Sequence, residues 1–168
     1  MPVAWEQRPG YLMSAVGAHV TIRFTELLAP HRLQPHHFGL LRRVSTQEGR
    51  TQQELADALH MRRAAVVGVV DDLEALGLLE RRKHPVDRRA NALHLTPAGK
   101  RLVLKMSAAI TVLENELLDP LAPAARTAFL EGLRQVAAVA GVADGVYPHP
   151  RDERSEEPLP SDRERPEA

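Results

Sequence analysis

Residues 51–96 contain two short helical patterns followed directly by an alternating one. Thr51 and Glu54 form the capping-box signature of a helix start, in which each side chain satisfies the backbone N–H of the other. A second apolar stripe ends before Gly77, a residue type that often terminates helices in the left-handed conformation. The segments LLERRK and NALHL then flank HPVDRRA, which predicts a two-stranded hairpin. This order predicts a winged helix-turn-helix, whose second helix is placed for the major groove of DNA. The second stripe consists of Val66, Val69, Val70, Leu73 and Leu76.

Helical patterns also flank this segment, so we expect a mainly α chain of about six helices plus a two-stranded β-hairpin wing. Apolar residues three and four apart predict a helix over 9–28, and a short helix follows Pro35. Thr96 and Pro97 suit the N-cap and first turn of a long helix, and a last helix is expected over 123–140. The first and last helices carry apolar sides formed by Leu12, Val16, Val20, Phe24 and Leu27, and by Phe129, Leu130, Leu133, Val136 and Ala137.

The composition excludes several classes of function. The 168 residues include no cysteine, which removes disulfides, thiolate zinc sites and cysteine nucleophiles. No serine lies in a nucleophile-elbow motif and no glycine-rich phosphate loop is present, so we expect no enzyme activity and no cofactor. The sequence also lacks a signal peptide and an apolar run long enough to span a membrane. We therefore expect a soluble, cytoplasmic protein.

The formal net charge of zero averages a basic middle and an acidic end. Residues 31–100 contain 12 Lys and Arg against 8 Asp and Glu, whereas residues 151–168 contain four Arg against seven acids. After Gly141 the sequence is rich in Pro and charge and almost free of large apolar residues. Such a segment cannot bury enough surface to offset its ordering entropy, so 143–168 is predicted to be a disordered acidic tail.

Several motifs of this chain occur together in one known family. TQQELA, VVDDLEALGLLER, DRR and LTPAG resemble the DNA-binding core of the multiple-antibiotic-resistance regulator (MarR) family, in the family's order across roughly residues 35–104. The resemblance implies a homodimeric transcriptional regulator, usually a repressor, that binds a short inverted repeat in double-stranded DNA. It also implies release from DNA by a small ligand, which is frequently aromatic or phenolic.

The resemblance further implies a division of the chain into layers. Residues 1–30, the N-terminal helix, and residues 97–142, the C-terminal helices, would form the dimerisation layer. Residues 31–96 would form the winged helix-turn-helix lobe that binds DNA. The acidic tail, 143–168, would lie outside both.

Two clusters of basic residues suit contacts with DNA phosphates. Arg62 and Arg63 begin the second helix of the pair, where the helix dipole also favours a phosphate. The second cluster, on the hairpin, is formed by Arg81, Arg82, Lys83, Arg88 and Arg89.

The resemblance assigns roles within the hairpin. Asp87 would pair with an arginine and hold the shape of the wing, and an arginine at the tip would enter the minor groove, with Arg88 and Arg89 as the candidates for both. A narrow A·T-rich minor groove has an enhanced negative potential, so such an arginine reads shape. The complete predicted DNA-binding set is Thr51, Gln52, Arg62, Arg63, Ala64, Val67, Gly68, Arg82, Lys83, Asp87, Arg88 and Arg89.

The second helix of the pair departs from the family pattern on its exposed face. Ala65 and Val67 stand where relatives often have Ser or Thr, and Gly68 stands where they often have Arg. An interior glycine costs about 1 kcal/mol relative to alanine and removes a donor, although it can permit close backbone approach. We therefore expect major-groove contacts to come from thymine methyls plus Arg62 and Arg63, and specificity to depend mainly on the wings.

Five residues are candidates for the effector pocket, which the resemblance places where the first two helices meet the long fifth helix. A ligand that binds the DNA-incompetent dimer better would shift the population away from DNA binding. An anionic aromatic acid would find its counter-charge in an arginine or a histidine of this set. Histidines on helices are often structural, and adjacent histidine rings are expected to diverge. The candidates are Tyr11, His19, Arg23, His36 and His37.

Two further functions stay open at this point. The weakened second helix leaves a winged-helix module for protein contacts, with weak DNA binding, as one alternative. A metal-responsive regulator is the other, because the chain has eight histidines. No two histidines lie four apart, however, and Asp57 with His60 is equally well explained as an exposed helix pair. No metal site is therefore predicted.

Overall fold

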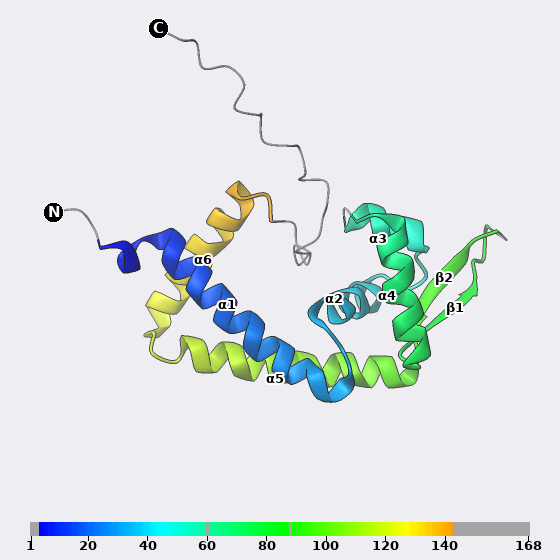
Figure 1. Ribbon diagram of the computed structural model, residues 1–168, viewed down its shortest axis with the longest axis horizontal. Helices are drawn as coiled ribbons and strands as arrows, with labels where there is room; N and C mark the ends of the chain where they lie inside the picture. The colour runs from blue at the N-terminus through cyan, green and yellow to red at the C-terminus, as the bar shows by residue number, and fades with distance from the viewer. Residues whose placement is uncertain (1–3, 60, 88, 143–168) are drawn as a thin grey trace, which may run out of the picture.

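The computed structural model of the chain describes residues 4–59, 61–87 and 89–142. Over these residues the protein is mainly α-helical, with six α-helices and one antiparallel pair of strands, as the sequence predicts (Figure 1). The predicted acidic tail, 143–168, lies outside the described residues. In chain order the elements are the 3-10 helix η1 (Trp5–Gln7), α1 (Pro9–Leu28), the 3-10 helix η2 (Ala29–His31), α2 (Pro35–Thr46), α3 (Gln52–Ala58), α4 (Arg63–Ala75), β1 (Leu79–Lys83), β2 (Asn91–Leu95), α5 (Pro97–Leu118) and α6 (Pro123–Val139).

The local signals that predict the helix ends are confirmed. The Thr51 backbone N–H donates to Glu54 Oε2 at 2.7 Å, and the Glu54 N–H donates to Thr51 Oγ1 at 3.2 Å. Hydrogen bonds from the Thr51 backbone N–H and then its hydroxyl lower the pKa of the Glu54 carboxyl. At the end of α4, Gly77 has a φ of 67°, and its N–H and that of Leu78 bond back to the carbonyls of Glu74 and Leu73. These two bonds form a Schellman motif.

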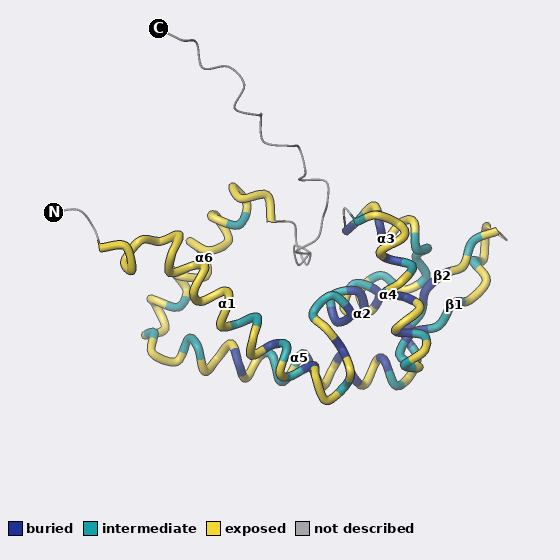
Figure 2. The backbone as a smooth tube through the Cα atoms, viewed as in Figure 1, coloured by how far each residue is buried: buried dark blue, intermediate teal, exposed yellow. Residues whose placement is uncertain are grey.

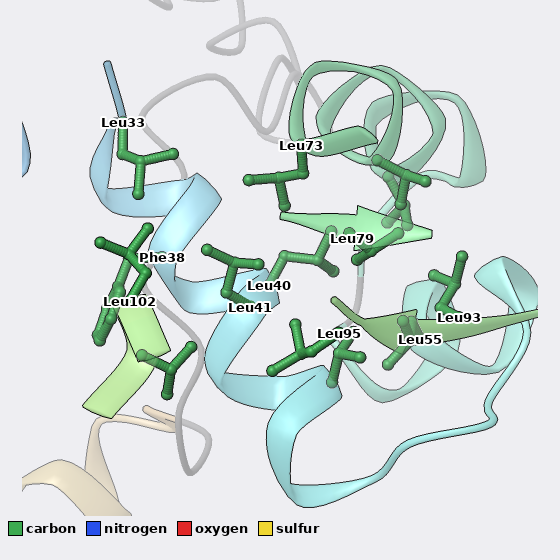
Figure 3. Close-up of a cluster of buried hydrophobic side chains, with 14 of the residues drawn as sticks. Leu33, Phe38, Leu40, Leu41, Leu55, Leu73, Leu79, Leu93, Leu95 and Leu102 are labelled. Atoms are coloured by element: carbon green, nitrogen blue, oxygen red, sulfur yellow. The ribbon is translucent and has the colours of Figure 1, made fainter. Parts of the chain in front are cut away.

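The buried core lies in the lobe formed by α2, α3, α4 and the hairpin (Figure 3). Leu41 of α2, Leu55 of α3 and Leu73 of α4 are completely buried, and Leu93 of β2 joins them from the sheet. Aliphatic side chains of this kind contribute about 1.5–3 kcal/mol each when fully buried. The helices of the lobe are therefore fixed relative to the hairpin by a shared apolar core.

A short segment before α3 extends the sheet in a way the sequence pattern does not predict. The Gly49 N–H donates to the Leu93 carbonyl, and the Leu93 N–H donates to the Arg50 carbonyl, both at 2.9 Å. An isolated bridge also pairs Thr51 with Ala92. The start of α3 is thereby hydrogen-bonded to the edge of β2, which ties the helix pair to the wing.

The start of α5 packs backbone against backbone on the end of α4. Thr96 Oγ1 accepts the Gly99 N–H at 3.0 Å, as expected of an N-cap residue, and donates to the Gly77 carbonyl at 2.7 Å. A Cβ at Gly99 would lie 2.0 Å from the Leu78 carbonyl oxygen, so only glycine permits this approach. The joint between α4 and α5 is therefore tight.

Outside the lobe, α1 and α5 lie side by side, and with α6 they form an arm whose surface is mostly exposed (Figure 2). The edge-to-face contact of Phe24 with Phe38, at 5.7 Å between ring centroids, joins the end of α1 to the lobe. Farther along the arm, the apolar residues predicted to share a face are uncovered: Leu12 is 48% exposed, Val16 52% and Phe129 46%. No residue of α6 is buried. None of the described helices is long and apolar enough to cross a membrane.

Candidate nucleic-acid interface

The helix α4 separates a buried face from an exposed one, as the periodicity predicts. Val66, Val70 and Leu73 are completely buried, whereas Arg63 and Gly68 are exposed. Figure 1 shows α4 beside the hairpin, so the two elements predicted to contact DNA are neighbours. Among the remaining predicted residues of this helix, Ala64 is exposed, Val67 is half-buried and Arg62 is the exposed N-cap residue.

The exposed face of α4 offers space where relatives of the predicted family often carry an arginine. A Cβ built on Gly68 meets nothing within 4 Å among the described residues, so no packing within this part of the chain requires glycine there. Arg63 lies in the first turn of α4, where unpaired N–H groups and the helix dipole favour an anion. The first turns of the helix therefore present a cationic end and small, weakly polar residues, whereas the exposed Asp71 and Asp72 lie in its later turns.

The hairpin pairs in a register that decides which basic side chains face outwards. Leu79 pairs with Leu95 and Arg81 with Leu93, so Arg81 lies on the core side of the sheet. Arg82 lies on the other side and donates from Nε to Glu80 Oε1 at 2.9 Å. Lys83 ends the strand and is exposed.

Arg81 does not belong to the outward-facing basic cluster in which the sequence analysis counts it. Its side chain is only 21% exposed, and its guanidinium binds Asp71 and Glu74 of α4. Its backbone N–H also donates to Glu74 Oε1 at 3.0 Å. Burial lowers the pKa of the guanidinium, but the hydrogen bonds to Asp71 and Glu74 outweigh burial and raise it. Arg81 therefore fastens the first strand of the wing to the predicted recognition helix, since two carboxylates surround its charge.

The tip of the wing is organised by two side chains that accept backbone hydrogen bonds. His84 Nδ1 accepts the N–H groups of Val86 at 3.3 Å and Asp87 at 3.0 Å. Asp87 Oδ1 accepts the Arg89 N–H at 2.9 Å. The turn closes with the Ala90 N–H donating to the Asp87 carbonyl at 3.1 Å. His84 therefore holds its proton on Nε2 and shapes the tip together with Asp87.

The wing role implied for Asp87 is modified by this geometry. Its described hydrogen bond goes to the backbone of Arg89, and no ion pair joins these two residues. Arg88, the other predicted partner, lies outside the described residues. Asp87 thus orients Arg89 through the main chain, and its pairing with Arg88 stays a prediction.

The predicted residues at the start of α3 occupy structural positions. The Thr51 hydroxyl accepts the Glu54 N–H and donates to Glu54 Oε2 at 2.9 Å, so it serves the helix cap. Gln52 is half-buried, and its Nε2 is buried without a hydrogen-bond partner in the described chain. Their contacts with DNA stay predictions.

Three of the five effector candidates lie along α1 in separate surroundings. The Tyr11 ring packs edge-on against Trp5, with 6.4 Å between ring centroids. His19 is exposed. Arg23 pairs with Glu116 of α5 at 3.4 Å, which links the two arm helices. These contacts do not bring the three side chains together.

The two adjacent histidines of α2 are packed against one another, contrary to the expectation that their rings diverge. The ring centroids of His36 and His37 lie 4.2 Å apart, and the ring planes are tilted by 48°. His37 is 7% exposed, and its Nδ1 accepts the Gln34 N–H at 3.0 Å, which caps α2. Its Nε2 lies 3.4 Å from Asp72 Oδ2 of α4. His37 therefore has a structural role, linking α2 to α4.

Among the described residues, no three His, Asp or Glu side chains lie close enough together to hold a metal ion. Asp57 accepts a hydrogen bond from Gln53 at 2.8 Å, and His60 lies outside the described residues.

The lobe formed by α2, α3, α4 and the wing is similar to a known protein family. The family model described as MarR family matches residues 32–90, the region from the start of α2 through the wing. Solved structures of MarR-family regulators superpose on most of the chain. The lobe of this chain matches the MarR family, and the fold is that of MarR-family regulators. The matched family consists of transcriptional regulators, and α4 occupies the position of the recognition helix in its winged helix-turn-helix fold.

Individual relatives extend the similarity beyond the lobe. The candidate transcriptional regulatory protein for the hcr operon of Thauera aromatica is 30% identical over 102 residues, which are 61% of this chain and 61% of that protein. The match thus spans about three fifths of the length of this relative. The transcriptional repressor CouR, bound to a 23-mer DNA duplex, is 29% identical, with a TM-score of 0.69 over 82% of this chain and 99% of that one. CouR from Rhodococcus jostii RHA1, bound to p-coumaroyl-CoA, is 25% identical, with a TM-score of 0.69 over 84% of this chain and 98% of that one.

Sequence reasoning missed His84, which holds the tip of the wing, and misplaced Arg81. The alternation of side chains along a strand could have predicted the position of Arg81. Arg81 lies two residues after Leu79 and therefore on the same face of the sheet, which is the buried one. No comparable signal marks His84, since Asp, Asn and Ser are the residue types expected to accept backbone N–H groups in turns. The side chain of His84 is identified only by the folded loop.

Proposed function

We propose that this protein is a MarR-family DNA-binding transcriptional repressor that acts as a homodimer on an inverted-repeat operator. The observation that carries the proposal is the placement of the exposed face of α4 beside an exposed cationic wing. The similarity to CouR, a repressor bound to a DNA duplex, supports the same role for the lobe. We assign 31–96 to DNA binding on this basis.

The homodimer is proposed from the uncovered apolar surface of the arm. Phe129, Leu133 and Val136 of α6 are 46%, 44% and 47% exposed, more than a stable monomer usually leaves in one helix. Covering this face with a second copy would place two recognition helices in one symmetric particle. A dimer with two-fold symmetry binds an inverted repeat whose half-sites lie about one helical turn of DNA apart. We therefore assign 1–30 and 97–142 to dimerisation.

Release by a small organic ligand, such as a phenolic or aromatic acid, completes the proposal. CouR from Rhodococcus jostii RHA1 has been solved with p-coumaroyl-CoA, a ligand that contains a phenolic acyl group. The candidates for such contacts in this chain are Tyr11, His19, Arg23, His36 and His37, of which Arg23 supplies a charge in the arm.

Fluorescence anisotropy with a labelled duplex from the promoter of the protein's own gene tests this function. We expect preference over a scrambled duplex of equal length, and a log–log salt slope that reflects several phosphate contacts. Addition of phenolic acids is expected to lower the affinity. Failure to bind either duplex at low salt would contradict DNA binding and favour a winged helix used for protein contacts.

A further inference from the structure

The charge of this protein is divided unevenly along the sequence. The first 142 residues contain 18 Lys and Arg against 14 Asp and Glu, whereas residues 143–168 contain four Arg against eight acids. Four of these acids lie within the six residues DERSEE, 152–157, which we name the acidic segment. A cationic body is therefore followed in the same chain by a segment of opposite charge.

The carboxylates of the recognition helix and the wing are already engaged within the lobe. Residues 62–89 contain five acids. Arg81 and Arg82 pair with three of them, His37 lies beside a fourth, and the fifth accepts a backbone N–H in the wing turn. The five acids are Asp71, Asp72, Glu74, Glu80 and Asp87. None of them is left over to balance the other cations of this surface.

Three exposed cations of the same elements have no carboxylate partner among the described residues: Arg63, Lys83 and Arg89. They define what we call the cationic face of the lobe. Arg63 lies in the first turn of α4, where the unpaired N–H groups and the helix dipole add partial positive charge. Groups that suit DNA phosphates also suit carboxylates, so this face fits an acidic peptide.

We propose that the acidic segment, 152–157, binds the cationic face of the lobe and competes there with DNA. Each exposed ion pair contributes little by itself, because water and salt screen it. A tethered segment, however, is present at an effective concentration in the millimolar range, which allows a weak contact to be populated. The competition rests on the DNA-binding function proposed above, whereas the contact itself does not.

The chain between the arm and the acidic segment is long enough for this contact. The described chain ends in the arm, just after α6, and α5 runs between the arm and the lobe (Figure 1). The 22 residues of α5 correspond to a length of about 33 Å at 1.5 Å per residue. The 15 residues 143–157 can span up to about 50 Å when extended. The four acids can therefore reach the lobe from the end of α6.

A spin label on the acidic segment tests the contact without DNA. The chain has no cysteine, so Ser155→Cys gives a unique attachment site for a nitroxide on the full chain. At low salt we expect the label to broaden the amide signals of Arg63, Lys83 and Arg89 in ¹H–¹⁵N spectra. The broadening should disappear at about 0.5 M salt, where the Debye length falls to about 4 Å. Addition of duplex DNA should remove it as well.

The matched control keeps the label and the length of the chain but removes the four negative charges of the acidic segment. We expect this variant to show no broadening of the cationic face. Absence of broadening in the parent chain, broadening confined to the arm or to Arg101 and Lys105 of α5, or unchanged broadening in the control would each overturn the contact. The control carries Asp152→Asn, Glu153→Gln, Glu156→Gln and Glu157→Gln.

DNA affinity tests the competition in two directions on unlabelled full-length chains. Neutralising the four acids is expected to tighten binding of a duplex about threefold to tenfold, because the tethered competitor is lost. Neutralising the four arginines of 143–168 makes the same region more acidic and should weaken binding by a similar factor. Equal affinities of the three chains would overturn the competition. If no chain binds DNA, the proposed function fails, while the spin label still decides the contact. The arginine variant carries Arg151→Gln, Arg154→Gln, Arg163→Gln and Arg165→Gln.

Discussion

The basic side chains of the wing are close in sequence but differ in what surrounds them. Arg81 forms ion pairs with Asp71 and Glu74, and Arg82 forms an ion pair with Glu80. Arg89 is exposed, and its backbone is held by Asp87. Among the described arginines of the hairpin, Arg89 is therefore the one best placed to reach a DNA groove.

Replacing Arg89 by Ala is expected to lower operator preference more than replacing Arg63 by Ala. An arginine that reads groove shape contributes to specificity, whereas one at a helix start contributes mainly to phosphate affinity. We expect a loss of preference of about 1–3 kcal/mol for Arg89→Ala, and a similar loss on operator and random DNA for Arg63→Ala. Competition gel shifts with both duplexes measure the ranking. The opposite order would contradict the dominant role of the wing.

A second prediction concerns His84, whose Nδ1 accepts two backbone hydrogen bonds at the tip of the wing. Replacing His84 by Ala removes the acceptor for the Val86 and Asp87 N–H groups, whereas Asn keeps an oxygen in place of Nδ1. We expect His84→Ala to weaken operator binding by about fivefold, the equivalent of one net hydrogen bond, and His84→Asn to retain most of the affinity. Anisotropy titrations and amide exchange of Val86 and Asp87 measure this. Equal losses in both variants would indicate that the imidazole itself, through Nε2, contacts DNA.

At the scale of elements, two glycines differ in how much space surrounds them. Gly99 lies in the tight joint between α4 and α5, and Gly68 lies on the exposed face of α4. A methyl group on Gly99 would collide with the Leu78 carbonyl oxygen, whereas one on Gly68 meets nothing within 4 Å. We expect Gly99→Ala to lower the free energy of unfolding by roughly 3 kcal/mol, because two backbones must separate. Gly68→Ala should raise it by up to about 1 kcal/mol, as alanine favours the helix. Urea unfolding monitored by circular dichroism distinguishes the two, and a stable Gly99→Ala protein would show that this joint is loose.

The recognition helix and the wing also act as one unit at this scale. Arg81 connects β1 to α4 through Asp71 and Glu74, while the Gly49 and Arg50 backbone groups connect the start of α3 to β2. Both connections lie beside the core of the lobe. The relative position of the helix pair and the wing is therefore set inside one chain.

At the scale of the whole molecule, the arm determines the expected assembly. Replacing Phe129, which is 46% exposed on α6, by Glu would place a charge in the proposed dimer interface. We expect the wild-type chain to have twice its 18.6 kDa mass in light scattering, and Phe129→Glu to dissociate. Val86→Glu is the control, because Val86 is 86% exposed in the wing at the far end of the molecule. A wild-type monomer, or a dimer unaffected by Phe129→Glu, would contradict the assignment of α6 to the interface.

The sequence by itself determined the elements of this protein and their order. Three helix-end signals each depend on only a few consecutive residues, so they form independently of the tertiary structure. They are the capping box of Thr51 and Glu54, the left-handed Gly77 and the Thr96 cap. The same local patterns carry the MarR motifs, which is why the family is visible before the fold.

Only the tertiary structure decided what the side chains at the surface do. Arg81, expected among the phosphate contacts, binds carboxylates of α4. His37, an effector candidate, is also the side chain that caps α2 and reaches Asp72. His31 of η2 and Lys105 of α5, 74 positions apart in the chain, meet with 3.5 Å between Nε2 and Nζ. The physical reason is that a charge or a hydrogen bond depends on its partner. In each of these cases the partner is brought near by packing, which no local pattern encodes.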